Sequence, residues 1–156
     1  MRKYIIILGI GILLTSCATH SNFYSFYKEN KKEADFSFGA SAFIANAFIP
    51  KEDLGAYKKL LRKFRYYRLM VFAENDKIDA EFDDFVKENK YSSLITVSEN
   101  GDKVNLYLLK EGDLIKEILM KVKSEGDYVL IDGKTKLLES ELYEILENSE
   151  IEVVGI

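Results

Sequence analysis

Regular alternation of apolar and polar residues in the second half of the chain is the strongest constraint on its fold. Four such runs fill residues 91–132, and turn sequences separate them at 99–102, 111–113 and 124–127. Each turn contains a glycine, and the Asn100-Gly101 pair is the sequence most typical of a β-hairpin. The spacing therefore predicts an antiparallel meander.

The third run, residues 114–123, predicts which side of the meander is covered. Ile118, Met120 and Val122 alternate there with Glu117, Leu119, Lys121 and Lys123. We expect the side that carries Ile118, Met120 and Val122 to be buried and most of the other side to face water.

Three further segments have apolar residues at the spacing of a helix. They are residues 51–64 with Leu54, Tyr57, Leu61 and Phe64, residues 79–89 with Phe82, Phe85 and Val86, and residues 139–148 with Leu142, Ile145 and Leu146. Asp79 stands where it can cap the second of these helices.

The segment before the first of these helices allows two interpretations. Phe36 and Phe38 alternate with polar neighbours, which predicts a short strand, followed by a helix over 42–49 that Ser41 caps. One continuous helix over 34–49 is the alternative.

These elements predict an α+β fold. Residues 66–72, rich in β-branched and aromatic side chains, add one more strand. We expect a mainly antiparallel sheet, with a C-terminal meander of about four strands, packed against two to four helices as a two-layer sandwich. Residues 34–150 contain no sequence typical of a linker, so we expect a single domain there.

The first 16 residues have the composition of a signal peptide. Arg2 and Lys3 precede ten uninterrupted apolar residues, Ile5–Leu14, fewer than the roughly 20 that a membrane-spanning helix needs. The residues Leu14-Thr15-Ser16-Cys17 resemble a bacterial lipobox. The resemblance implies cleavage between Ser16 and Cys17 and acylation of Cys17 with fatty chains such as palmitate. An ordinary cleaved signal and a plain transmembrane anchor are the alternatives.

Residues 17–33 have the composition of a tether between that anchor and the domain. Polar residues surround four aromatic residues, Phe23, Tyr24, Phe26 and Tyr27, which either lie among lipid headgroups or pack onto the domain. In lipoproteins of the Bacteroidota, a cluster of acidic residues after the acylated cysteine resembles a signal for export to the cell surface. This chain has the neutral Ala18 and Thr19 at that place. We therefore expect an outer-membrane protein that faces the periplasm.

The order of the hairpins is similar to that of one known family. Residues 91–112 and 114–150, with Ile118-Leu119-Met120 in one strand, resemble the family called domain of unknown function 4252, small envelope lipoproteins of the Bacteroidota. The likeness covers about residues 35–148. It implies a lipid-anchored α+β domain with no established activity, and it offers no catalytic residues to carry over.

Few residues of this chain are suited to catalysis or metal binding. Its one histidine, His20, lies in the tether, and Cys17 is assigned to lipid, so neither a Ser-His-acid triad nor a zinc site is expected. The acids of residues 74–84 lack the spacing and central glycine of a calcium loop, and capping and a solvated helix face explain them. We expect no enzyme, cofactor or metal; a hydrolase that uses carboxylates is an alternative.

One basic cluster stands out in an acidic protein. Removing Arg2 and Lys3 with the leader leaves 20 bases against 26 acids, a net charge near −6, which disfavours nucleic acid as a partner. Seven bases nevertheless fall together: Lys51, Lys58, Lys59, Arg62, Lys63, Arg65 and Arg68. We expect them on the exposed side of the helix, where Lys58, Lys59, Arg62, Lys63 and Arg65 either contact anionic headgroups or an acidic partner, or form a solvated face.

The function predicted from these features is that of a lipid-anchored, non-catalytic binding module of the cell envelope. Its contacts would be the membrane, through the lipid, and a second envelope protein. A periplasmic accessory or sensor protein in envelope signalling is the alternative.

Replacing Cys17 by serine tests the anchor. Because each buried methylene of an acyl chain adds about 0.8 kcal/mol of membrane affinity, the native chain should partition into the detergent phase of a phase-separation extraction and Cys17→Ser into the aqueous phase. Ser16→Ala is the matched control, since a small residue there keeps the lipobox. Native protein in the aqueous phase would contradict the prediction.

Overall fold

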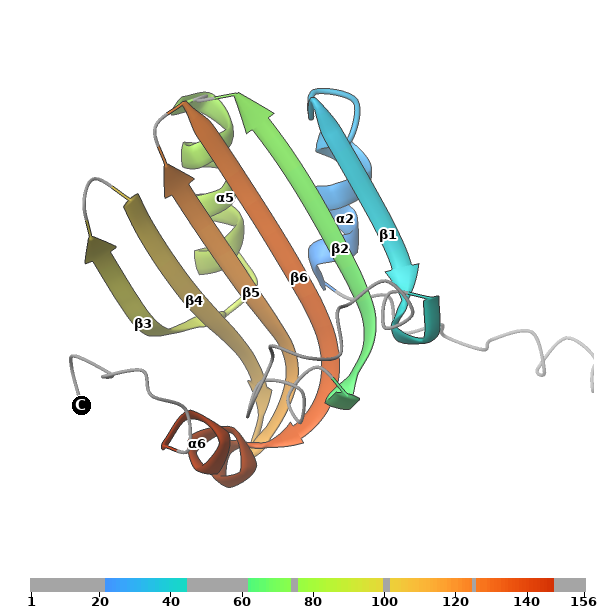
Figure 1. Ribbon diagram of the computed structural model, residues 1–156, viewed down its shortest axis with the longest axis vertical. Helices are drawn as coiled ribbons and strands as arrows, with labels where there is room; N and C mark the ends of the chain where they lie inside the picture. The colour runs from blue at the N-terminus through green and yellow to red at the C-terminus, as the bar shows by residue number, and fades with distance from the viewer. Residues whose placement is uncertain (1–21, 45–61, 74–75, 100–101, 125, 148–156) are drawn as a thin grey trace, which may run out of the picture.

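A six-stranded antiparallel sheet organises this chain, whose computed structural model describes residues 22–44, 62–73, 76–99, 102–124 and 126–147. The strand order is β1-β2-β6-β5-β4-β3 (Figure 1). The strands are β1 (Phe36–Ser41), β2 (Phe64–Ala73), β3 (Ser92–Glu99), β4 (Asp102–Glu111), β5 (Leu114–Ser124) and β6 (Asp127–Leu138). The helices named in these ranges are α2 (Asn22–Asn30), α5 (Asp76–Glu88) and α6 (Glu139–Glu147).

The predicted meander is confirmed as β3 to β6, but the sheet is larger than expected. The alternation predicted an end near Asp132, whereas β6 continues to Leu138. The outer side of β6 pairs with β2, and β1 pairs with β2 in turn, both antiparallel. The strands predicted from Phe36 and Phe38 and from residues 66–72 therefore extend the meander to six strands.

The predicted α+β class is confirmed, but helices pack on both faces of the sheet, with α6 only at the lower end of its face, so the structure is not a simple two-layer sandwich (Figure 1). In Figure 1, α2 and α5 lie behind the sheet, while α6 lies at its lower end. Tyr107 and Leu119 belong to the cluster with α2 and α5, whereas their chain neighbours Leu108 and Ile118 pack with Leu142 of α6. Because successive strand residues point to opposite faces, α6 covers the face opposite to α2 and α5.

Helix α2 corrects the predicted tether. Phe23 and Phe26, one turn apart, are 0% and 4% exposed and stack on each other at 5.7 Å between ring centroids. Phe26 also meets Phe82 and Phe85 of α5, at 5.6 and 5.2 Å. Of the two interpretations of these aromatics, packing onto the domain is therefore the observed one, and the domain begins by Asn22 instead of residue 34.

The other predicted helices have mixed outcomes. Helix α6 and the inner face of α5 are confirmed. Ala42–Ile44 are helical directly after β1, which excludes one continuous helix over 34–49. The predicted helix 51–64 is described only at its end, where Arg62 and Lys63 are helical and Phe64 already begins β2. Residues 51–61 of this helix, and residues 45–49 of the helix predicted over 42–49, lie outside the described ranges.

The aromatic ring of Phe64 lies directly on Gly133 of β6. A Cβ atom added at Gly133 would lie 2.2 Å from Phe64 Cε1 and 2.4 Å from its Cδ1. The ring is held by Tyr67, 5.3 Å away between centroids, and by the cluster around α6. Only glycine at residue 133 leaves room for this packing.

Gly133→Ala should lower the free energy of unfolding by about 1–3 kcal/mol, because the fixed ring must move. Urea denaturation measures the change. The matched control, Gly39→Ala on β1, should cost less, since its nearest atom is the hydroxyl end of Tyr66 at 3.0 Å. Adding Phe64→Leu should recover part of the loss; simple additivity of the two changes would show that the ring is not the cause.

Candidate functional site

The charged residues of β5 point under the helices, opposite to the expectation from their hydropathy. Glu117, Leu119 and Lys121 are 1%, 1% and 7% exposed, on the side that α2 and α5 cover. Met120 and Val122, on the other side, stay half-buried. The expectation that the polar side of β5 faces water was therefore wrong, and the reason is ion pairing beneath the helices.

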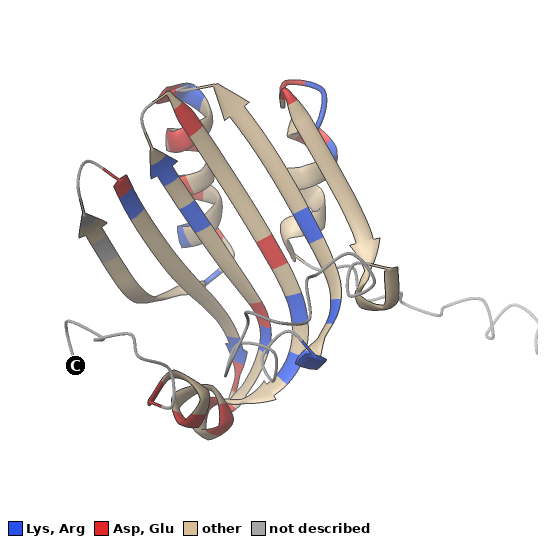
Figure 2. Cartoon of the chain, in the orientation of Figure 1, with Lys and Arg blue, Asp and Glu red and all other residues tan. Residues whose placement is uncertain are grey.

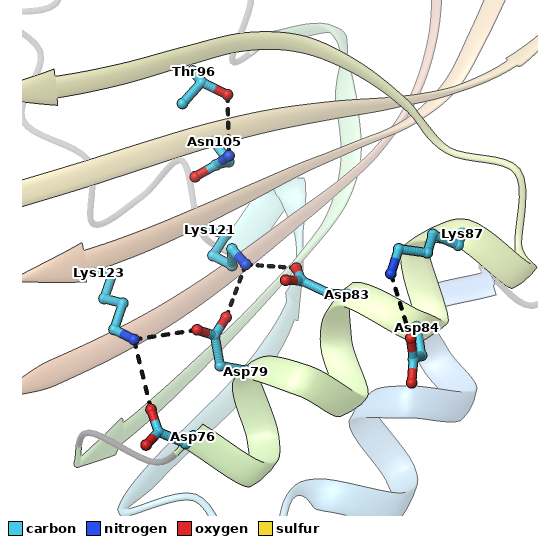
Figure 3. A network of polar contacts seen from close by, with 9 residues as sticks. All are labelled: Asp76, Asp79, Asp83, Asp84, Lys87, Thr96, Asn105, Lys121 and Lys123. Atoms are coloured by element: carbon cyan, nitrogen blue, oxygen red, sulfur yellow. Dashed lines mark hydrogen bonds and ion pairs between the residues drawn. The ribbon is translucent and has the colours of Figure 1, made fainter.

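Lys121 is neutralised by two carboxylates of α5. Its Nζ lies 2.8 Å from Asp79 Oδ1 and 2.5 Å from Asp83 Oδ1 (Figure 3). Lys123 Nζ adds a contact to Asp79 Oδ2 at 3.2 Å. Asp79 thus joins helix to sheet instead of capping the helix, and Asp79 and Asp83 are not part of a simple solvated face.

The pKa shifts in this network have opposite signs on the two partners. Burial alone would raise the pKa of Asp79, but hydrogen bonds from Lys121 and Lys123 outweigh it and hold the pKa below its ordinary value. Burial would lower the pKa of Lys121, but its bonds to Asp79 and Asp83 raise it instead. The network is therefore charged, and stabilising, across neutral pH.

A second set of buried polar side chains lies deeper, and we call Tyr91, Glu117, Asp132 and Arg68 the buried polar chain. Tyr91 Oη donates to Glu117 Oε2, and Arg68 Nη1 donates to Asp132 Oδ2 at 2.5 Å. Arg68 and Asp132 are 8% and 0% exposed. Figure 2 shows basic and acidic positions along β5 and β6, within the sheet and not only at its ends.

Ionisation of the buried polar chain is restricted by its surroundings. Burial, and then the neighbouring Glu117 carboxyl, raise the pKa of Asp132 well above its ordinary value, against the opposing effect of Arg68. Burial and the charge of Glu117 also raise the pKa of Tyr91. With both carboxyl groups shielded from solvent, this acid pair gives no support to the hydrolase alternative.

The opposite face of the sheet carries, beside the end where α6 packs, two rows of apolar side chains, which we call the open face. The register aligns them across the strands. One row is Phe38, Leu69, Ile131, Met120, Leu106 and Ile95, and the other is Phe36, Val71, Val129, Val122 and Val104. None of these residues is charged, and each is half-buried or exposed, although Leu106 and Ile95 also pack against the cluster that contains α6.

The edge of the open face at β1 is its most exposed part. Phe36 and Phe38 are 52% and 43% exposed. Strand β1 carries no charge, and its pairing with β2 has no register shift, whereas the pairing of β3, at the other edge, shifts between Ser93 and Ile95. Charges and bulges are usual protections of an edge strand, and within the described residues β1 has neither of them.

The predicted site residues are only partly described. Ser16, Cys17, Lys58 and Lys59 lie outside the described ranges, so lipidation stays a prediction. Arg62, Lys63 and Arg65 are exposed.

The structure divides the predicted basic cluster. Lys63 pairs with Glu141 of α6 at 2.7 Å, while Arg65 and Arg68 belong to β2, with Arg68 buried. The expectation that all seven bases line one exposed helix side was therefore wrong for Arg65 and Arg68.

Two general properties of the described ranges bear on function. No helix within them is long and apolar enough to cross a membrane. In the same part of the chain, no group of three or more His, Cys, Asp or Glu side chains is arranged to hold a metal ion.

Comparison with known proteins gives one match. The model of the family described as a domain of unknown function, DUF4252, matches residues 26–145. The chain belongs to this family. The match begins within α2 and includes the buried polar chain and the open face. No curated protein and no solved structure matches the chain.

The sequence predictions missed both the buried polar chain and the open face. The signal was present in β5, where Glu117 and Lys121 flank Leu119, and in β6, where Asp132 follows Leu130 and Ile131. An acid within an apolar strand is typical of a buried partner, but the sequence does not name that partner.

Lys121→Met should lower the free energy of unfolding at pH 7 by about 1–3 kcal/mol, because Asp83 loses its buried partner. This value is smaller than the loss for a fully buried pair, because the Asp83 side chain is 45% exposed. The lowered pKa of Asp79 means that this contribution is present above about pH 4 and disappears as pH falls further. Urea titrations at several pH values measure it.

The control for this change is Lys87→Met, which removes an exposed pair with Asp84 at 3.5 Å. It should leave the urea midpoint unchanged. An equal loss in both variants at every pH would contradict a buried network.

Proposed function

We propose that this chain is a lipid-anchored protein of the cell envelope that acts as a non-catalytic interaction module, with the open face as its contact surface. The observation that carries the proposal is the distribution of charged and apolar side chains between the two faces of the sheet. Charged side chains are buried under α2 and α5, while two uncharged apolar rows remain half-buried or exposed. Contiguous apolar surface of this kind marks interaction sites in soluble domains.

The chemistry of the open face defines the partner it fits. Eleven aliphatic and aromatic side chains without a formal charge match an apolar surface on a second envelope protein, and they offer nothing to an acidic or basic one. Phe36 and Phe38 are the exposed aromatic anchors that dominate such contacts.

The lipid anchor supports the same function from the other end of the chain. The lipobox-like Leu14-Thr15-Ser16-Cys17 would hold the domain at a membrane surface. Confinement to a membrane raises the effective concentration of any partner in the same membrane. A modest apolar contact is then sufficient for association.

The basic residues are a weaker candidate for the contact surface. Of those described, Lys63 is already paired with Glu141, and the exposed Arg62 and Arg65 are not members of the two apolar rows. We therefore assign the partner to the open face.

A photo-crosslinker placed at Phe38 in cells tests this assignment. The expected result is a discrete protein adduct whose yield falls at least tenfold, about 1.4 kcal/mol of contact energy, when Met120→Lys puts a charge in the same row. Ser98→Lys, at an exposed position of β3, is the control and should leave the adduct unchanged. An adduct that survives Met120→Lys would refute the open face as the contact surface.

A further inference from the structure

Exposed large apolar side chains gather at one edge of the sheet. The described residues contain five of them, and four fall within residues 36–44: Phe36, Phe38, Phe43 and Ile44. The first two belong to β1, and Phe43 and Ile44, 89% and 49% exposed, belong to the helical residues directly after it. We call these four residues the apolar edge. The fifth, Leu138, ends β6, which β2 separates from β1.

The backbone of β1 has a strand on one side only. Within the described ranges, β1 pairs with β2 and ends the strand order. On the other side, every second residue of β1 presents its N–H and C=O groups outward, and another strand is the partner that satisfies such a row. Strand β1 contains no charge and no proline, so its sequence lacks the features that block such pairing.

We propose that β1 pairs antiparallel with β1 of a second copy of this chain, which gives one continuous sheet across a homodimer. Antiparallel pairing of two identical strands is isologous, because one two-fold axis relates them and closes the contact. The cross-strand neighbours then come from residues 36–41, which are uncharged, so no like charges oppose each other. At the other edge of the sheet, β3 has a register shift and ends at Glu99, which disfavours growth beyond a dimer.

The symmetry of this pairing keeps the two faces of the sheet separate. A two-fold axis relates adjacent antiparallel strands only if it is perpendicular to the sheet, and residues opposite one another in such a pair point to the same face. The open face of one copy therefore continues into the open face of the second copy, with Phe36 and Phe38 of both copies at the junction. The helices α2 and α5 of both copies lie together on the other side.

The apolar edge is large enough for a weak dimer. Since a phenylalanine side chain can bury about 150–250 Å², the exposed fractions of Phe36, Phe38 and Phe43 leave roughly 300–450 Å² per copy. Two copies supply roughly 600–900 Å² before Ile44 and the strand backbones are counted, and a specific interface needs about 1,000 Å². An interface of this size is at the weak end, so we expect a dissociation constant in the micromolar range.

The pairing goes beyond the proposed contact with a second envelope protein and does not depend on it. It uses the edge of β1, whereas the proposed partner contacts the rows of the open face, which the pairing extends. Helix α2 is the first described element after Cys17, and the two-fold axis places both copies of α2 on one side of the joined sheet. Two anchored copies can therefore pair in one membrane, where confinement strengthens a weak contact. This last point alone rests on the proposed lipid anchor.

Sedimentation equilibrium of the full-length chain in a density-matched non-ionic detergent measures the pairing, at about 1–100 µM protein, on both sides of a micromolar dissociation constant. Phe38→Lys places like charges next to each other across the two-fold axis and should raise the dissociation constant by about tenfold or more. Leu138→Lys, the same kind of change at a side chain that is 48% exposed, is the matched control and should leave the dissociation constant unchanged.

A mixture of two variants separates lost pairing from lost folding. Equal amounts of Phe38→Lys and Phe38→Glu should recover the dimer, because opposite charges then meet across the axis. Far-UV circular dichroism of each variant should match that of the native chain. If the variants at Phe38 do not fold, Phe36→Lys and Phe36→Glu replace them under the same criteria.

Three results would overturn the proposal. The first is a native chain that stays monomeric at the highest of these concentrations, as it would if another segment or protein occupied β1. The second is a dimer that Phe38→Lys leaves intact. The third is loss of the dimer with Met120→Lys, which would place the self-contact on the open face instead of the edge of β1. In cells, an adduct of two copies has twice the mass of the chain, so it is distinguished from an adduct with a second envelope protein.

Discussion

The pairing of β5 charges beneath the helices is the constraint on which the rest of the structure depends. Lys121 cannot be buried without Asp79 and Asp83, and Glu117 cannot be buried without Tyr91 and a proton or cation nearby. The two aspartates fix α5 on one face of the sheet, and α2 joins the same face through Phe23 and Phe26 in the aromatic core. Since side chains alternate along a strand, the same pairing sends Met120 and Val122 to the other face.

The open face is thus a consequence of burying charge, and that makes it unusual. A domain that needed only stability would bury the aliphatic rows and leave lysine and glutamate in water, because ion pairs add little over apolar packing at the same site. Here Phe36, Phe38 and the residues aligned with them stay accessible while Asp132 is 0% exposed. This distribution is the reason that we propose the open face as a contact surface.

Local patterns in the sequence predicted where most helices and strands lie along the chain, but not which face of each strand is buried under the helices. The alternation around Asn100-Gly101 and the helical spacing of Leu142 and Leu146 depend on neighbours within a few residues, and the hairpin and α6 were predicted correctly. Lys121 meets Asp79 across 42 residues, and Phe26 meets Phe82 across 56 positions of chain. Pairings of that length determine which face is buried, and no local pattern encodes them.

Helix α2 shows why the side of the sheet matters for function. It was predicted as part of a passive tether, yet Phe23 and Phe26 complete the aromatic core, and the Tyr24 ring lies 5.1 Å from the Arg68 guanidinium carbon. The face that carries Arg68 and Asp132 is the one that α2 covers, and the opposite face is the one that we propose for a partner.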